Sequence, residues 1–189
     1  MSKRSGVLEL AILGLLHEAP MHGYELRKRL SEMLGTVRTV SFGSLYPTLR
    51  RLQQQGDIVE DSSAATATRP PATTRRGRKT YRITTRGKGT LAALLDEPVT
   101  ASFADDCFGV HLAFFDRTPG PARVRLLEGR RRVLEERRES QRDAATRAGP
   151  TELRYARQLT LLGLETSERE LRWINELIRT ENPSQGDPQ

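Results

Sequence analysis

Apolar side chains recur at helical spacing in three stretches near the beginning of the chain. They are Leu8, Ile12 and Leu15 in the first stretch, Leu26, Leu30 and Met33 in the second, and Leu45, Leu49 and Leu52 in the third. Each set predicts a helix with one apolar side. We expect the first helix to end at Pro20 and a turn over 21–23. Gly35 and Gly56 are expected to end the other two.

After the third predicted helix the pattern changes from helical to alternating. The segment DIVED predicts a short strand, and polar and apolar residues alternate in KTYRITT, which predicts a second strand. Between them lies SSAATATRPPATTRRGR, whose composition cannot form a packed core and predicts a mobile loop. Thr84 or Thr85 is expected to cap a fourth helix over 86–95. This order of elements is typical of a winged helix-turn-helix module.

The second half of the chain has a different composition. Four of the five phenylalanines lie in SFADDCFGVHLAFFD, and two long charged helices follow on either side of Gly149-Pro150. Each of these helices has a narrow apolar stripe that it cannot bury alone. We therefore expect the helices to pack against those of a second copy and form a dimer. The alternative is that they fold back onto the first half.

These patterns predict a mainly α fold with a small β-hairpin. The expected parts are a winged helix-turn-helix domain over 1–96, a Phe-rich linker over 97–120, a helical dimerisation region over 121–181 and a disordered tail over 182–189.

Charge narrows the class of partner. The 189 residues carry a net charge of +7 and the pI is near 10.2, which favours a polyanion, either nucleic acid or an anionic membrane surface. No apolar stretch approaches the roughly 20 residues of a membrane-spanning helix. A single cysteine, Cys107, excludes a disulfide within the chain. Glu9 interrupts the apolar run near the N-terminus, so we do not interpret that run as a secretion signal and expect a cytoplasmic protein.

The sequence offers no constellation for catalysis or metal binding. His17, His22 and His111 lack metal-ligand spacing. Asp105 and Asp106 are adjacent and would point in different directions, so paired acid–base catalysis is not expected. There is no phosphate-binding glycine loop and no nucleophile elbow. We therefore predict neither an enzyme nor a cofactor.

The third predicted helix carries a polar face opposite its leucines. A helix that reads the major groove needs an apolar back and, near its N-terminal end, side chains that reach bases or phosphates. The candidates on this helix are Ser44, Tyr46, Thr48, Arg50 and Arg51. An ordinary solvated surface is the alternative. The neighbouring segment favours DNA, because residues 62–95 contain no acidic residue and include Arg75, Arg76, Arg78 and Lys79, which would suit phosphates or a minor groove.

Three motifs resemble the PadR type of transcriptional regulator. They are LELAILGLLHEAPMHGYEL, GSLYPTLRRLQQQGDI and GRKTYRITTRGKGTL, in the order of that family. The resemblance implies a homodimeric winged-helix DNA-binding protein, usually a repressor, that dimerises through its C-terminal helices. It also implies that a small aromatic or lipophilic effector releases DNA, as in some relatives. The extra wing stretch AATATRPPATT departs from the family pattern.

Carried over by position, the resemblance implies particular contacts. Those with operator DNA are Tyr24, Ser44, Tyr46, Thr48, Arg50 and Arg51, with Arg78 and Lys79 in the basic wing. Tyr24 is equally compatible with a packing role.

Phe103, Phe108 and Trp173 are candidates for an effector pocket, although dimer packing explains them as well. Two alternatives to a sequence-specific regulator stay open at this point. One is a winged-helix module that binds other proteins, and the other is a non-specific architectural DNA-binding protein.

Overall fold

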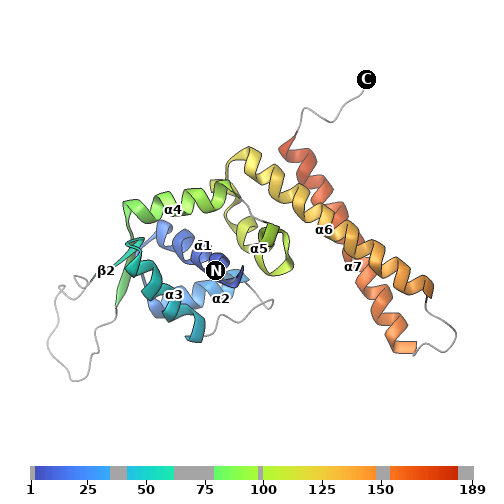
Figure 1. The fold of residues 1–189 in the computed structure, drawn as a ribbon, viewed down its shortest axis with the longest axis horizontal. Helices are drawn as coiled ribbons and strands as arrows, with labels where there is room; N and C mark the ends of the chain where they lie inside the picture. The colour runs from blue at the N-terminus through green and yellow to red at the C-terminus, as the bar shows by residue number, and fades with distance from the viewer. Residues whose placement is uncertain (1–2, 35–41, 62–78, 98–99, 148–153, 183–189) are drawn as a thin grey trace. The chain divides into compact units, whose positions relative to one another are not determined.

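The computed structural model describes residues 3–34, 42–61, 79–97, 100–147 and 154–182 (Figure 1). The first half contains α1 (Lys3–Glu18), β1 (Met21–His22), α2 (Gly23–Leu34), α3 (Phe42–Gln54), β2 (Ile58–Asp61), β3 (Thr80–Ile83) and α4 (Thr85–Asp96). The second half contains η3 (Thr100–Phe103), α5 (Asp105–Ala113), η4 (Phe115–Arg117), α6 (Gly120–Arg147) and α7 (Arg154–Glu181). The expected wing loop lies outside the described residues, as does the expected C-terminal tail apart from Asn182.

The chain divides into two compact units. The first unit comprises Met1–Glu97 and Asp105–Thr118, and the second comprises Pro98–Ala104 and Pro119–Gln189. The segment 97–120, expected to be a linker, contains η3, α5 and η4 and is shared between the two units.

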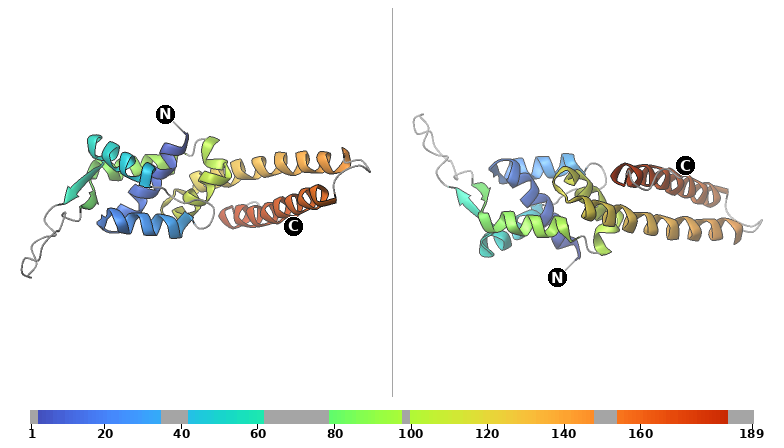
Figure 2. Two further views of the ribbon diagram at one scale, coloured as in Figure 1. Left: turned by 90° about the horizontal axis from the view of Figure 1, so that it is seen from below. Right: turned by 90° about the horizontal axis from the view of Figure 1, so that it is seen from above.

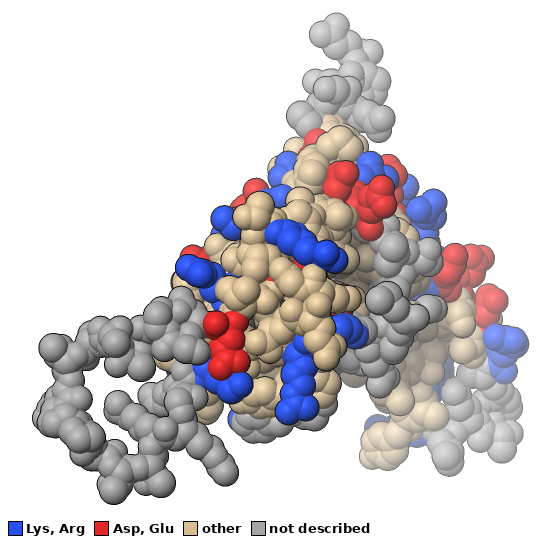
Figure 3. All heavy atoms as spheres, turned by 60° about the vertical axis from the view of Figure 1, so that its left-hand side comes forward, with Lys and Arg blue, Asp and Glu red and all other residues tan. Residues whose placement is uncertain are grey.

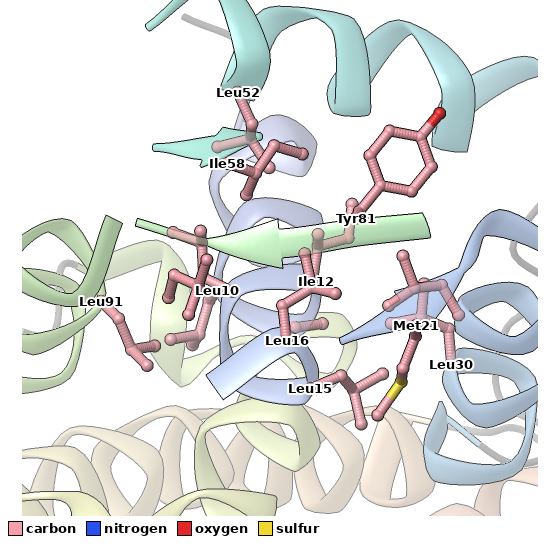
Figure 4. Packing of buried hydrophobic residues seen from close by; sticks show 14 of the residues in the cluster. Leu10, Ile12, Leu15, Leu16, Met21, Leu30, Leu52, Ile58, Tyr81 and Leu91 are labelled. Carbon is pink, nitrogen blue, oxygen red and sulfur yellow. The ribbon is translucent and has the colours of Figure 1, made fainter. Parts of the chain in front are cut away.

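The first unit is a winged helix built around α1. This helix packs against α2, α3, α4, α5 and β3, which explains why its residues 10–13 are buried on successive sides. Figure 4 shows Ile12 and Leu16 of α1 among side chains from the sheet and the surrounding helices. The predicted leucines of α3, at positions 45, 49 and 52, are all buried in the same cluster.

The sheet has three strands rather than the two predicted. Its order is β1-β3-β2, and both pairs are antiparallel. Met21 pairs with Tyr81 and His22 with Thr80, although the sequence predicted a turn over 21–23. The prediction was wrong because the two residues between Pro20 and Gly23 are too few to show an alternating pattern. They nevertheless satisfy backbone groups at the edge of β3.

A network of hydrogen bonds joins the end of α3 to the beginning of α4. Gly56 follows α3 with φ 75°, a left-handed conformation that suits glycine. The Thr84 hydroxyl donates to the Gly56 carbonyl at 2.7 Å and accepts from the Gly87 amide at 3.0 Å, so Thr84 is the N-cap of α4. The buried Asp57 carboxylate accepts from the Thr90 hydroxyl at 2.9 Å. The two ends of the wing are thereby fixed relative to α3.

The second unit contains an antiparallel helical hairpin. Arg123 pairs with Glu181 at 2.8 Å and Arg142 with Glu168 at 2.8 Å, so residue numbers rise along α6 as they fall along α7. The two views in Figure 2 show α6 and α7 side by side. Leu127, Leu134, Leu171 and Ile174 are buried in this unit.

Arg130 anchors η3 to the hairpin. It is buried, pairs with Glu170 of α7 and donates from Nη1 to the Phe103 carbonyl at 3.0 Å. Removing either charge would leave its partner poorly compensated in a low-dielectric setting.

Candidate nucleic-acid interface

The exposed arc of α3 is the part of the first unit that best fits a nucleic acid. Leu45, Leu49 and Leu52 are buried and hold the helix on the core. The side chains exposed along α3 are Ser44, Tyr46, Pro47, Arg50 and Gln54. This division arises because leucines at i, i+4 and i+7 occupy one side of a helix with 3.6 residues per turn. Hydroxyl, guanidinium and amide groups are therefore available on the opposite side.

Thr48 does not lie on that arc. Its side chain is only 7% exposed, and its hydroxyl donates to the Ser44 carbonyl at 2.8 Å. Position 48 comes three residues after Leu45, so it flanks the buried leucines rather than opposing them. The expectation of an accessible hydroxyl at this position was wrong.

Arg51 is directed toward the core of the first unit. Its guanidinium pairs with the Glu9 carboxylate of α1, and both side chains are largely covered. An arginine held in this way stabilises the position of α3 on α1. Arg50, its neighbour, is exposed. The structure thus distinguishes two adjacent arginines that the sequence treated alike.

Three tyrosines lie near the beginning of α2. Tyr24 is 70% exposed, which does not fit the packing role that the sequence left open. A β-carbon placed on Gly23 would lie 3.3 Å from the Tyr46 hydroxyl and 3.6 Å from the Tyr81 ring. Tyr46 of α3 and Tyr81 of β3 therefore converge on the residue that precedes Tyr24.

The base of the wing carries an ion pair. The Lys79 ammonium lies 2.9 Å from a Glu60 carboxylate oxygen across β2 and β3. This hydrogen bond, together with the charge of Glu60, raises the pKa of Lys79, while the positive charge of Arg50 opposes the rise. Burial, and then the charge of Glu60, raise the pKa of Tyr81. Glu60 and Lys79 therefore form an ion pair at the base of the wing.

Glu60 was not among the residues predicted from the sequence to lie at this interface. The alternation of the two strands was the available signal, because it places position 60 beside the basic end of the wing. Arg75, Arg76 and Arg78 lie outside the described residues. In the view of Figure 3 acidic and basic side chains are interspersed rather than separated into one basic patch.

The three aromatic residues considered for an effector have different surroundings. Phe103 lies against Gly129 of α6, and Phe108 is buried in α5. Trp173 of α7 is 41% exposed. Effector binding at these residues stays a prediction.

Neither a metal centre nor a membrane span is found among the residues described. No group of three or more His, Cys, Asp or Glu side chains there is arranged to hold a metal ion. No helix within the described ranges has both the length and the apolarity needed to cross a bilayer.

Comparison with known proteins gives a family match in the first half of the chain. Residues 12–93 match the model of the transcriptional regulator PadR-like family. This range contains α3 and the described parts of the wing. No curated protein matches the chain.

Solved structures to which this chain is similar include two of Bacillus subtilis PadR. One is in complex with operator DNA, with a TM-score of 0.42, and the other with p-coumaric acid, with a TM-score of 0.40. Each is 20% identical, covering 93% of this chain and 99% of that one. A putative transcriptional regulator from Thermoplasma acidophilum is 31% identical, with a TM-score of 0.37, and the match covers 47% of this chain and 75% of that one.

Proposed function

Because this chain belongs to the PadR-like family of transcriptional regulators, we propose that it is a sequence-specific DNA-binding protein that acts as a homodimeric repressor in the cytoplasm. Members of this family are regulators of transcription and not enzymes.

The observation that carries the proposal is the exposed arc of α3. Arg50 and Tyr46 are exposed on a helix whose opposite side is anchored by buried leucines, and the exposed Lys79 lies at the base of the wing. A guanidinium can donate two hydrogen bonds to a guanine edge or to a phosphate. Ser44 is exposed near the N-terminal end of α3, where helix-turn-helix proteins usually contact bases.

In the proposed complex α3 enters the major groove of the operator. Ser44 and Arg50 contact bases or nearby phosphates, and Tyr24 and Tyr46 contact the DNA backbone. Arg75, Arg76, Arg78 and Lys79 hold flanking phosphates through the wing. Thr48 and Arg51 do not contact DNA in this proposal. Thr48 donates to the Ser44 carbonyl within α3, and Arg51 pairs with Glu9 and holds α3 against α1.

We further propose that α7 contributes the dimer contact. Tyr155, Leu159 and Leu162 are exposed at i, i+4 and i+7 along this helix, a stripe that water would otherwise cover. A homodimer would present two copies of α3 to half-sites about one helical turn apart. Release by a small aromatic or lipophilic compound, with Phe103, Phe108 and Trp173 as candidate contacts, is the regulatory part of the proposal.

Equilibrium binding to the DNA upstream of its own gene, and to a shuffled duplex of equal length, tests the function. We expect Arg50→Ala to weaken operator binding by roughly 1–3 kcal/mol if Arg50 contacts a base. Arg132→Ala removes the same charge from an exposed position of α6 and serves as the matched control. Equal affinity of the unsubstituted protein for operator and shuffled duplex would contradict sequence-specific regulation, as would equal losses in the two variants.

A further inference from the structure

We infer that Glu60 is a specificity-determining residue. Its carboxylate pairs with Lys79 and competes with the phosphates of arbitrary DNA, and a phosphate of the operator displaces it when α3 is bound in the groove. This inference rests on the proposed function. It concerns an acidic side chain in a region where the sequence reasoning considered only cations.

The ion pair lies on the sheet face that is turned toward α3. Glu60 of β2 is the direct partner of Tyr81 in β3, so both side chains lie on the same face. Lys79 precedes Tyr81 by two positions and shares that face. Figure 4 shows the Tyr81 ring pointing from β3 toward α3. The strand β2, which carries Glu60, packs against α3.

The pair is accessible from solvent on the side of Lys79. The Lys79 side chain is 62% exposed, whereas Glu60 is 26% exposed. A phosphate can therefore approach the ammonium without first opening the fold. The Glu60 carboxylate already occupies one hydrogen-bonding direction of that ammonium, so it stands where a DNA phosphate oxygen would bind.

The ion pair between Glu60 and Lys79 affects complexes with arbitrary DNA and complexes with the operator differently. Binding to arbitrary DNA depends on phosphate contacts alone, and the charge of Glu60 both repels phosphates and competes for Lys79. On an operator, base contacts made by α3 fix the base of the wing against the backbone, and a phosphate then displaces Glu60. The carboxylate therefore lowers affinity for arbitrary DNA more than affinity for the operator.

The test compares Glu60→Gln with the unsubstituted full chain on operator and shuffled duplexes over a range of salt concentrations. We expect affinity for the shuffled duplex to rise about three- to fivefold, the worth of one exposed ion pair, with a smaller rise on the operator. The dependence of log K on log salt for the shuffled duplex should steepen by about 0.9, the value for one additional phosphate contact. Glu136→Gln makes the same charge change at an exposed position of α6 and is the matched control.

A second variant shows whether Glu60 acts through Lys79. In a Lys79→Gln background, Glu60→Gln should no longer raise affinity for the shuffled duplex. Equal rises for Glu60→Gln and Glu136→Gln would overturn the inference, as would equal rises on the two duplexes or an undiminished rise without Lys79. If the unsubstituted protein fails to prefer the operator at all, the proposed function fails rather than this refinement of it.

Discussion

Gly87 and Gly89 lie two positions apart in α4 but have very different surroundings. A β-carbon on Gly87 would lie 2.0 Å from the Asp57 carbonyl oxygen, whereas one on Gly89 would meet nothing within 4 Å. We expect Gly87→Ala to lower the free energy of unfolding by about 1–3 kcal/mol, because backbone would have to move. Gly89→Ala should raise it by about 0.5–1 kcal/mol through helix propensity. Urea unfolding of the two variants measures both effects, and a Gly87→Ala protein as stable as Gly89→Ala would contradict the described packing of Asp57 on α4.

His111 makes stability depend on pH. Burial in α5 lowers its pKa from the ordinary value of 6.5 to about 4. Between these two pH values the unfolded chain binds more protons than the folded chain, so the free energy of unfolding falls as the pH falls. The loss is about 3 kcal/mol over the whole interval. His111→Gln should remove most of this slope, whereas His17→Gln, at an exposed position, should preserve it. Thermal unfolding at a series of pH values checks this, and parallel slopes in all three proteins would contradict it.

At the scale of residues, periodicity predicted the leucines of α3 but not the environment of every polar neighbour. Arg50 and Arg51 are adjacent and chemically identical, and only the position of Glu9 on another helix distinguishes them. Thr48 is a different case, because its contact with the Ser44 carbonyl lies within α3 and its place beside the leucine stripe follows from its spacing to Leu45. The Arg51–Glu9 contact depends on packing between helices, which local sequence patterns do not contain.

Among the elements, the long helices were predictable because each repeats its apolar period several times, and the strand β3 because polar and apolar residues alternate in KTYRITT. The two-residue strand β1 was not, since its evidence lies in β3, far along the sequence. The Phe-rich segment was expected to link two domains but contains α5, and Val110 of this helix and Phe114 just after it belong to the core of the first unit. The phenylalanine content of this segment indicated that its side chains are buried, but not in which of the two units.

The exposed stripe of α7 predicts the behaviour of this helix in solution. Leu159 is 70% exposed, and we expect it to be covered in the dimer. Leu159→Glu places a charge in that apolar contact and should shift the mass of the particle from two chains toward one. Gln158→Glu adds the same charge at the adjacent exposed position and should have a smaller effect. Light scattering over a range of concentrations measures both. The role given to α7 would be contradicted by an unsubstituted protein with the mass of one chain, or by equal effects of the two changes.

For the molecule as a whole, the net charge of +7 indicated a polyanionic partner but did not indicate where it binds. In the structure the candidate binding surface is the exposed arc of α3 together with the base of the wing. A cation-rich chain can still distinguish arbitrary DNA from an operator if some of its cations are held by nearby carboxylates, as Lys79 is by Glu60. Specificity in this account therefore depends on acidic as well as basic side chains.

The central claim is that the exposed arc of α3 lies in a DNA groove, and a tethered cleavage reagent tests it most directly. A DNA-cleaving iron chelate would be attached at Ser44→Cys, with the protein bound to its operator. The unsubstituted protein, whose single Cys107 is buried, controls for attachment elsewhere, and Gln158→Cys controls for an exposed position on α7. We predict focused strand cleavage inside each half-site from position 44 only. Uniform cleavage along the duplex, or the same pattern from positions 44 and 158, would contradict the claim.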